Sequence, residues 1–383
     1  MPSPSSLRIV MLAHSYPRFP GDVAGSFLGR LAEALVQKGH VVSVIVPADR
    51  GKADRFTLGG ATVIPVRYAS PEREDLAYGG DMAARSAGIG GAWTFWRLVR
   101  AMRAGARTEA RRIGAQLVHA FWWVPGGWSA VGVGIPSIIT LMGTDVAMMR
   151  SGAGRLLGRR VLARATVVCA ISTFLADEAR RLLALPDLEI DRVPVPVDVT
   201  RFEAPPVPIG AGIIYLGRLS KQKRVNLLLD AVKTEGLKVP VTIIGDGPAR
   251  VELEEQARRL GLEQVRFLGQ VPDADVPPAI RGAAVAAFLS ENEGLGLAAA
   301  EALMMGTPVV ATTDGGGVLD LVKDGEGACV VPPTPADIGR ALARCLGQPA
   351  LRAGAATAGV RLRRELSPEA VAAQFEDVYA RII

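Results

Sequence analysis

Short apolar strands alternate with amphipathic helices along this chain, and this alternation limits its fold more than any other feature. Residues 7–13 form a buried-strand pattern, a loop rich in proline and glycine follows, residues 27–38 have helical periodicity, and 41–47 is a second strand pattern. A strand, a helix and a strand in this order form a βαβ unit, whose two strands pair in parallel. The sequence therefore predicts an α/β protein built on parallel sheets.

The alternation occurs in two series, separated by a proline-rich segment at 203–210 that we interpret as an interdomain linker. Further strands are expected at 117–120, 137–141 and 165–171 in the first series, and at 212–217, 239–245, 265–269, 283–289 and 309–312 in the second. With 383 residues the chain is long enough for two domains. We predict Rossmann-like, doubly wound domains at 1–204 and 211–366 that face each other across a cleft.

Charge and cysteine content restrict the class of protein further. The net charge is +6, but the sequence has no aromatic-basic motif typical of RNA or DNA binding, so no nucleic-acid partner is expected. Cys169, Cys329 and Cys345 lack metal-ligand spacing and are interpreted as core residues of a reducing compartment. No signal sequence opens the chain and no apolar run approaches ~18 residues, so a cytoplasmic location is expected.

Two glutamates on either side of a glycine-rich turn give the strongest indication of chemistry. Glu293 is expected on a loop after a buried strand, and Glu301 about one turn into a helix at 298–305. The helix N-terminus between them offers free N–H groups and a partial positive charge. This layout suits a ligand with a phosphate in the middle and hydroxyls at both ends, such as a sugar nucleotide. An ordinary glycine turn before a helix is the alternative.

Two cations follow the first strand of the second series. Arg218 and Lys223 emerge from the carboxyl end of that strand, where fixed positive charges can hold a diphosphate and stabilise it as it leaves. The Gly-Asp-Gly at 245–247 is weak evidence by itself. It does not match G-x-G-x-x-G, and this argues against a nicotinamide dehydrogenase.

Taken together, these motifs resemble those of the retaining glycosyltransferases of family 4, which have the GT-B fold. The resemblance is carried by Gly217-Arg-Leu with Lys223, by Gly245-Asp-Gly-Pro, and by the Glu293–Glu301 segment followed by alanine, in this order and spacing. Val195-Pro-Val-Asp198 with Phe202 also matches a landmark of that family. The similarity covers essentially the whole chain.

The resemblance implies a role for each donor-side residue. Arg218 and Lys223 would bind the diphosphate, Glu301 the ribose hydroxyls and Glu293 the transferred sugar. The remaining implied donor contacts are backbone or glycine positions: Gly25, Val271, Gly294, Leu295, Gly296 and Leu297. The final helix at 367–383 would cross back onto the first domain. The family needs no metal, so Asp273-Ala-Asp275 is interpreted as surface and no cofactor is expected besides the donor, a UDP- or GDP-linked sugar.

The acceptor side departs from the family pattern. Where the family has His-x-His, this chain has His119 and Phe121, and where it has His-Gly-x-Asp, this chain has Met142 and Asp145. Alternation along a strand points His119 and Phe121 to the same side, so His119 is either catalytic or structural. His14, after the first strand, and Asp145 are candidate acceptor-side residues; packing is the alternative for His14. The glycine that follows the lysine in the family is Arg224 here.

A basic helix predicted at 93–113 suggests a membrane surface. Its apolar residues share one face, while most of its arginines share the other with Trp93 and Trp96. A solvated helix face explains the arginines but not two tryptophans among them, a pattern typical of a membrane interface. We therefore expect peripheral binding to the anionic inner face of the cell membrane.

These observations predict a retaining glycosyltransferase that moves a hexose-type sugar from a nucleotide-diphospho-sugar to an acceptor hydroxyl. A lipid-linked or cell-envelope glycan is the expected acceptor. Two alternatives remain open: a sugar-nucleotide epimerase or phosphorylase of the same fold, and a non-catalytic subunit that binds a sugar nucleotide.

Overall fold

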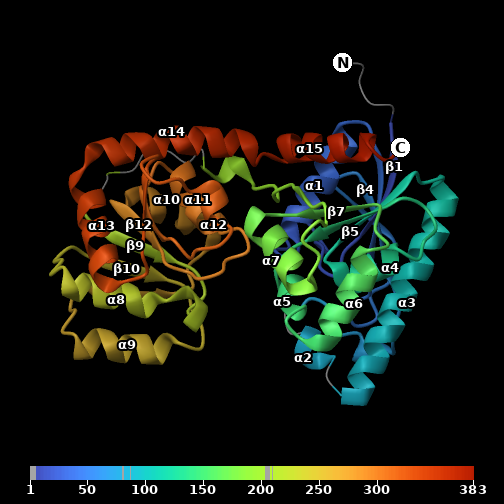
Figure 1. The fold of residues 1–383 in the computed structure, drawn as a ribbon, viewed down its shortest axis with the longest axis horizontal. Coiled ribbons are helices and arrows are strands. Elements are labelled where there is room, and N and C mark those ends of the chain that lie inside the picture. The colour runs from blue at the N-terminus through green and yellow to red at the C-terminus, as the bar shows by residue number, and fades with distance from the viewer. Residues whose placement is uncertain (1–5, 80–81, 87, 203–207, 209) are drawn as a thin grey trace. The chain divides into compact units, whose positions relative to one another are not determined.

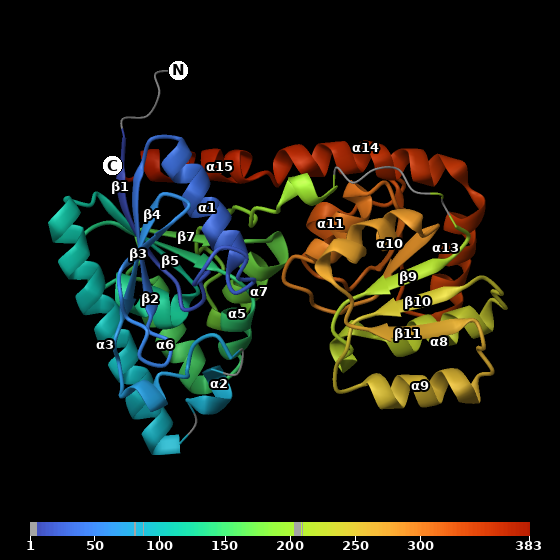
Figure 2. The ribbon, with the colours of Figure 1, turned by 180° about the vertical axis from the view of Figure 1, so that it is seen from behind.

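The computed structural model describes residues 6–79, 82–86, 88–202, 208 and 210–383. The chain divides into two compact units: the first comprises Met1–Asp198 and Leu366–Ile383, and the second Val199–Glu365. Most of the linker predicted at 203–210 lies outside the described residues. Each unit has helices on both faces of a central sheet (Figures 1 and 2).

The sheet of the first unit has the strand order β3-β4-β2-β1-β5-β6-β7-β8. Its strands are β1 (Arg8–Leu12), β2 (Val41–Pro47), β3 (Phe56–Leu58), β4 (Ala61–Val66), β5 (Leu117–Phe121), β6 (Ser137–Leu141), β7 (Val167–Ala170) and β8 (Asp191–Arg192). β3 and β4 are antiparallel, and the other neighbours pair in parallel. The predicted strands at the positions of β1, β2, β5, β6 and β7 are confirmed.

Helices cover both faces of this sheet, because its central strands are apolar on both sides. They are α1 (Ser26–Gln37), α2 (Met82–Arg85), α3 (Gly88–Ile113), α4 (Trp128–Ala130), α5 (Thr144–Met148), α6 (Gly152–Leu162), α7 (Thr173–Leu183) and α15 (Pro368–Ala380), with the short helical turns η1 (Pro71–Arg73) and η2 (Trp123–Gly127). Along β1, Ile9 and Met11 pack in a cluster with α1 and α15, whereas Val10 and Leu12 pack with α3. A strand buried on both faces reads as an uninterrupted apolar run.

The last helix of the chain, α15, packs on the first unit beside α1 (Figures 1 and 2). Ser367 caps it by accepting a hydrogen bond from the Ala370 N–H at 3.1 Å, and Pro368 is its first residue. Its apolar stripe is buried in the same cluster as Ile9: Val371, Ala372, Phe375, Val378 and Tyr379. Burial of each large side chain stabilises this contact by about 1.5–3 kcal/mol.

The second unit has a parallel sheet with the order β11-β10-β9-β12-β13-β14. Its strands are β9 (Ile213–Leu216), β10 (Val241–Ile244), β11 (Val265–Gly269), β12 (Val285–Phe288), β13 (Val309–Thr312) and β14 (Ala328–Val331). Its helical elements are η3 (Val199–Phe202), η4 (Lys221–Lys223), α8 (Val225–Thr234), α9 (Arg250–Arg259), η5 (Asp273–Asp275), α10 (Val276–Gly282), α11 (Leu297–Met304), α12 (Val318–Leu321), α13 (Pro335–Gly347) and α14 (Pro349–Glu365). All the strands predicted in this part are confirmed.

Candidate active site

The chain reverses direction across the sheet of the second unit between β9 and β12. From β9 it continues to β10 and β11 on one side, and then returns to β12 on the other. Open α/β sheets bind ligands at such a switch point, beyond the carboxyl ends of the two strands. The loops that meet there, 217–224 and 289–296, carry most of the predicted donor-side residues.

Lys223 and Glu293 form an ion pair across this switch point. The Lys223 Nζ donates to Glu293 Oε2, and the two side chains are 25% and 22% exposed, so both remain accessible to a ligand. Backbone hydrogen bonds hold Glu293 in place: its N–H donates to Gly315 O at 3.1 Å, and its carbonyl accepts from Gly317 N at 2.8 Å. Burial, and then the charge of Glu293, raises the pKa of the neighbouring Tyr215 hydroxyl.

Helix α11 begins directly after this loop, as the sequence predicted. Gly296 precedes it with φ 74° and ψ 47°, and a Cβ at this position would lie 2.0 Å from Val318 Cγ2. The glycine therefore lets the chain turn tightly against α12 and brings the N-terminus of α11 to the switch point. Leu295 is buried beneath the turn, and Glu301 lies partly buried about one turn into the helix.

Arg218 and Val271 lie at other places on the same edge of the sheet. Arg218 follows β9, is exposed, and forms no ion pair within the described residues. Its carbonyl accepts from the Tyr215 hydroxyl at 3.2 Å, which ties the loop to the strand. Val271 is partly buried two residues after β11 ends at Gly269. The roles predicted for these two residues remain predictions.

Arg224 also belongs to this site, although its position in the sequence predicted no role for it. Its backbone is left-handed, with φ 50° and ψ 38°, and its guanidinium bonds Asp314 at 2.7 Å and also Glu291. It thereby joins the loop after β12 to the loop after β13. The one signal in the sequence was an arginine where the family has glycine, and its two acidic partners lie too far along the chain to be paired by inspection.

In the first unit the switch point lies between β1 and β5, and His14 and Trp122 meet there. Their ring centroids are 4.2 Å apart, and His14 Nδ1 is buried without a hydrogen-bond partner among the described residues. Burial lowers the pKa of His14 to about 4, so the ring is neutral at pH 7. An unpaired polar atom at this place is consistent with a ligand contact.

Gly25 ends the loop that follows β1 and precedes α1. It has φ 60°, and a Cβ would lie only 2.3 Å from the carbonyl oxygen of Ser15. The loop is therefore packed too tightly on itself for any side chain at this position. This packing accounts for the glycine, and its contact with a donor diphosphate remains a prediction.

Asp145 is a buried carboxylate bonded to the backbone of the first unit, and the acceptor contact predicted for it remains a prediction. It is 1% exposed, and its carboxylate accepts backbone hydrogen bonds of 2.9–3.0 Å from the N–H groups of Trp123, Met142, Gly143 and Val146. Burial raises its pKa, and these four donors oppose the rise. The carboxylate holds together the turns that follow β5 and β6.

His119 is likewise a core residue, and its placement does not support a catalytic role. It points to the same side of β5 as Phe121, with ring centroids 4.2 Å apart, but α15 covers that side. Both ring nitrogens are engaged, Nδ1 with the Tyr379 hydroxyl and Nε2 with Thr140 Oγ1, each at 2.8 Å. The ring is fully buried, which lowers its pKa to about 3.

Comparisons with known proteins agree with this architecture. The family model described as Glycosyl transferase 4-like domain matches residues 24–196, and that of Glycosyl transferases group 1 matches residues 209–360. Glycogen synthase of Mycobacterium tuberculosis is 27% identical over 97% of this chain and 94% of its own length. D-inositol 3-phosphate glycosyltransferase of Thermomonospora curvata is 30% identical over 69% of this chain and 70% of its own.

A solved structure shows the same fold over nearly the whole chain. Anabaena HepE, crystallised in complex with UDP-glucose, aligns with a TM-score of 0.70 and 18% identity over 98% of this chain and 100% of HepE. Two sheets with helices on both faces, each with its own switch point, agree with the GT-B fold, as predicted, and the two family models identify a glycosyltransferase. This chain belongs to glycosyltransferase family 4.

Proposed function

We propose that this chain transfers a hexose-type sugar from a nucleotide-diphospho-sugar, UDP- or GDP-linked, to an acceptor hydroxyl with retention at the anomeric carbon. The Lys223–Glu293 pair carries this proposal, because it sets a cation and a carboxylate side by side at the switch point. Such a pair suits a donor in which a phosphate and a sugar hydroxyl are neighbours. The UDP-glucose bound by HepE supports the nucleotide sugar.

The charges of the second unit suit the departure of a diphosphate. The bond between the anomeric carbon and the diphosphate oxygen breaks, the acceptor oxygen bonds to the same face of that carbon, and its proton passes to the departing phosphate oxygen. Lys223, Arg218 and the N-terminus of α11 stabilise the negative charge that develops on the phosphate. Glu293 orients the sugar and Glu301 the ribose, and no step requires a metal.

Single substitutions test these assignments. Lys223→Ala and Glu301→Ala should each reduce turnover by at least ~10²-fold, as the loss of one electrostatic stabiliser does elsewhere. Lys221→Ala is the matched control, since Lys221 lies two residues away on η4 and is exposed. The donor is chosen by thermal-shift screening of UDP, GDP, ADP and TDP sugars. Near-wild-type turnover in both variants would refute the site.

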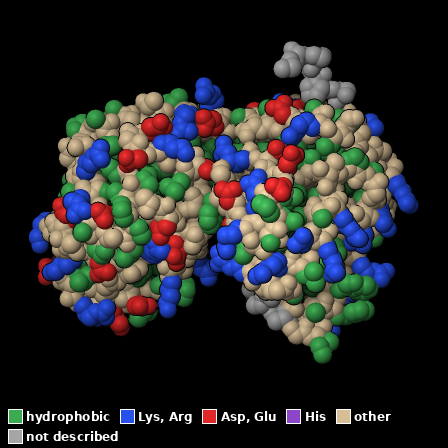
Figure 3. Space-filling model, viewed as in Figure 1, with side chains coloured by type: hydrophobic (Ala, Val, Ile, Leu, Met, Phe, Trp, Pro, Cys, Tyr) green, Lys and Arg blue, Asp and Glu red, His purple; other side chains and the backbone are tan. Residues whose placement is uncertain are grey.

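We further propose that α3 docks on an anionic membrane, with a lipid-linked or cell-envelope glycan as the acceptor. Apolar side chains at the start of α3 are exposed, with Ile89 93%, Trp93 58% and Trp96 38% accessible. The Arg100 guanidinium lies 4.7 Å above the ring of Trp96. Figure 3 shows hydrophobic side chains gathered at the tip where α3 begins, with Lys and Arg side chains above them. No helix in the described part of the chain is long and apolar enough to cross a bilayer.

The basic surface extends from α3 to α6. Arg155, Arg159, Arg160 and Arg164 are exposed there, and the charges of Arg107, Arg164 and Arg100 add to burial in lowering the pKa of Arg103. Since these charges act on one another, the two helices present a single cationic surface. Tryptophans beside it suit the level of lipid headgroups.

Vesicle sedimentation tests the membrane proposal. Each arginine near an anionic surface contributes about 1 kcal/mol, so Arg97→Glu with Arg100→Glu should weaken binding to phosphatidylserine vesicles by at least ~25-fold. Arg258→Glu with Arg259→Glu, an exposed pair on α9, makes the same change in charge and should leave binding nearly unaltered. Equal binding by both double variants, or no binding at low salt, contradicts the proposal.

A further inference from the structure

A cationic pocket lies in the first unit, at the carboxyl edge of its sheet. It has a volume of about 400 Å³ and is lined by the loops that follow β1, β2 and β4. The lining residues are Arg18, Asp49, Arg50, Lys52, Asp75, Ala77, Tyr78, Gly79 and Arg85. Parallel sheets bind ligands at this edge, and none of the donor-side residues described above lines this pocket.

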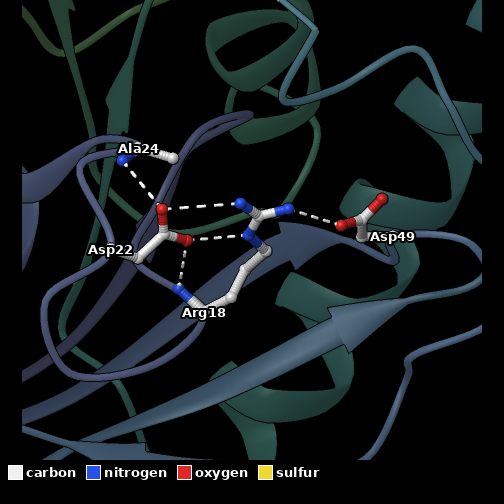
Figure 4. A network of polar contacts seen from close by, with 4 residues as sticks. All are labelled: Arg18, Asp22, Ala24 and Asp49. Atoms are coloured by element: carbon white, nitrogen blue, oxygen red, sulfur yellow. Dashed lines mark hydrogen bonds and ion pairs between the residues drawn. The ribbon is translucent and has the colours of Figure 1, made fainter.

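Arg18 is fixed in position on the pocket wall. Its Nε donates to Asp22 Oδ2 at 2.7 Å and its Nη1 to Asp49 Oδ2 at 2.6 Å, while Asp22 also accepts from the Ala24 N–H at 3.2 Å (Figure 4). The guanidinium carbon lies 4.7 Å from the ring centroid of Tyr78. A cation held in this way meets an anion with little further loss of side-chain freedom.

The pocket is lined by more cationic than acidic side chains. Arg85 pairs with Asp75, and Asp49 pairs with Arg18. Arg50 and Lys52 are the remaining cations; they form no ion pair with any residue that the structure describes. The pocket therefore presents two cations without an ion-pair partner among the described residues, and four cations face three acids once Asp22, the other partner of Arg18, is counted.

Hydrogen bonds hold the turn that carries Arg50 and Lys52 in place. Buried Glu74 accepts from the Gly51 N–H at 3.0 Å, its carbonyl accepts from the Arg50 N–H at 3.1 Å, and Lys52 N donates to Asp49 O at 3.0 Å. Arg50 has φ 46°, a left-handed conformation that non-glycine residues adopt at a cost of about 1–2 kcal/mol. Strained residues held by such a framework gather at ligand sites.

We propose that this pocket binds a phosphate group of the acceptor. Two cations without ion-pair partners among the described residues, beside a fixed guanidinium, can both bond the oxygens of a phosphomonoester, which carries about −1.5 to −2 charge at pH 7. The pocket thereby selects phosphorylated acceptors over neutral ones. The inference rests on the proposed transfer to a hydroxyl acceptor, and it assigns the acceptor's anionic group to the first unit.

Binding of inorganic phosphate at low salt, measured by calorimetry, tests the pocket itself. Arg50→Ala with Lys52→Ala should weaken phosphate binding at least tenfold, since two charge-assisted contacts are lost. The charge-conserving Arg50→Lys with Lys52→Arg should restore most of it. Arg159→Ala with Arg160→Ala removes two exposed cations elsewhere in the same unit and serves as the control. Equal phosphate affinity in the wild type and the Arg50/Lys52 alanine variant would overturn the proposal, and so would no phosphate binding by the wild type.

Acceptor competition identifies the source of the phosphate and separates this proposal from the proposed function. Glucose 6-phosphate represents a soluble phosphate and phosphatidic acid vesicles a lipid phosphate. Either one, but not glucose, should displace inorganic phosphate; displacement by neither overturns the proposal. The Arg50/Lys52 alanine variant should bind the donor nucleotide sugar as the wild type does, because neither residue is among the donor-side residues and the charged ones lie in the second unit. If the wild type binds phosphate here but no nucleotide sugar, the proposed function fails and the pocket stands.

Discussion

Substitutions at Arg224 distinguish two effects in the second unit: the strain of its left-handed backbone, and the anchoring of a loop by its side chain. Its left-handed backbone, with φ 50°, costs a non-glycine residue about 1–2 kcal/mol, whereas glycine adopts it freely. Its side chain, 19% exposed, pairs with Asp314 and Glu291 and so holds the loop that carries Glu293. We expect the arginine to be kept for this anchoring rather than for stability.

The expected changes in stability follow from how exposed the two acidic partners of Arg224 are. The Glu291 and Asp314 side chains are 41% and 38% exposed, so each ion pair is worth about 0.2–1 kcal/mol. Arg224→Gly loses both pairs but relieves the strain, and the stability of the second unit should change by less than about 1.5 kcal/mol. Arg224→Ala loses the pairs and keeps the strain, so it should be less stable than the glycine variant by about 1 kcal/mol, or roughly 2–4 °C.

The two variants should differ in stability, but both should lose activity. Both variants release the 291–293 loop, and a small misplacement of Glu293 is costly, so kcat/KM should fall at least ~10-fold in both. Calorimetry gives the melting of the second unit, and initial rates with the selected donor give kcat/KM. Arg361→Ala, which instead removes the ion pairs of an α14 arginine with Glu326 and Glu365, is the control for charge loss alone.

Two results would refute this reasoning separately. If the glycine and alanine variants melt at the same temperature, the left-handed backbone at Arg224 carries no strain. If both variants keep wild-type kcat/KM, the anchoring has no part in catalysis.

Three further predictions concern the two units separately. Gly296→Ala should destabilise the second unit by about 2–4 kcal/mol in urea unfolding, because its Cβ would lie 2.0 Å from Val318 Cγ2. The control is Gly236→Ala, also at positive φ but in open space, which should cost about 1 kcal/mol. Burial lowers the pKa of His119 to about 3, below its unfolded value near 6.5. The stability that neutral His119 contributes to the first unit is therefore complete above pH 6.5 and is lost as the pH falls. The difference in stability between the wild type and His119→Gln should shrink by about 2 kcal/mol from pH 7 to 5, and a constant difference would contradict this. Phe375→Ala on α15 should destabilise the first unit by about 3–5 kcal/mol in urea while the nucleotide sugar still binds.

Most of the fold could be predicted because its strands are buried on both faces. β1, β2 and β6 read as apolar runs of the right length, and βα alternation then required parallel sheets. β3 and β4 were missed because their residues are mostly only partly buried and Pro65 interrupts the pattern. The start of α3 was placed five residues late, since glycines at 88–91 do not read as a helix.

The donor residues were predictable for a topological reason. The strands before Lys223 and Glu293 are neighbours at a switch point, so any residues that follow them lie at the same edge of the sheet. Their direct ion pair was not predictable, since it depends on how the two loops close. The sequence left His119 as either catalytic or structural, because nothing local indicates that α15, some 250 residues later, covers its side of β5.

This covering by α15 changes where the specificity of the enzyme for its acceptor should be sought. Phe121, which replaces a family histidine, is 1% exposed in the core, and Met142 packs against the same cluster. The departure at Phe121 therefore alters packing, whereas Met142 is partly buried and directly follows β6 at the carboxyl edge of the sheet. The loops after β1, β2 and β4 also reach that edge, and there Arg50 and Lys52 form no ion pair with any described residue. Since loops tolerate change more readily than strands, acceptor preference is expected to vary with these loops and donor preference with the second unit.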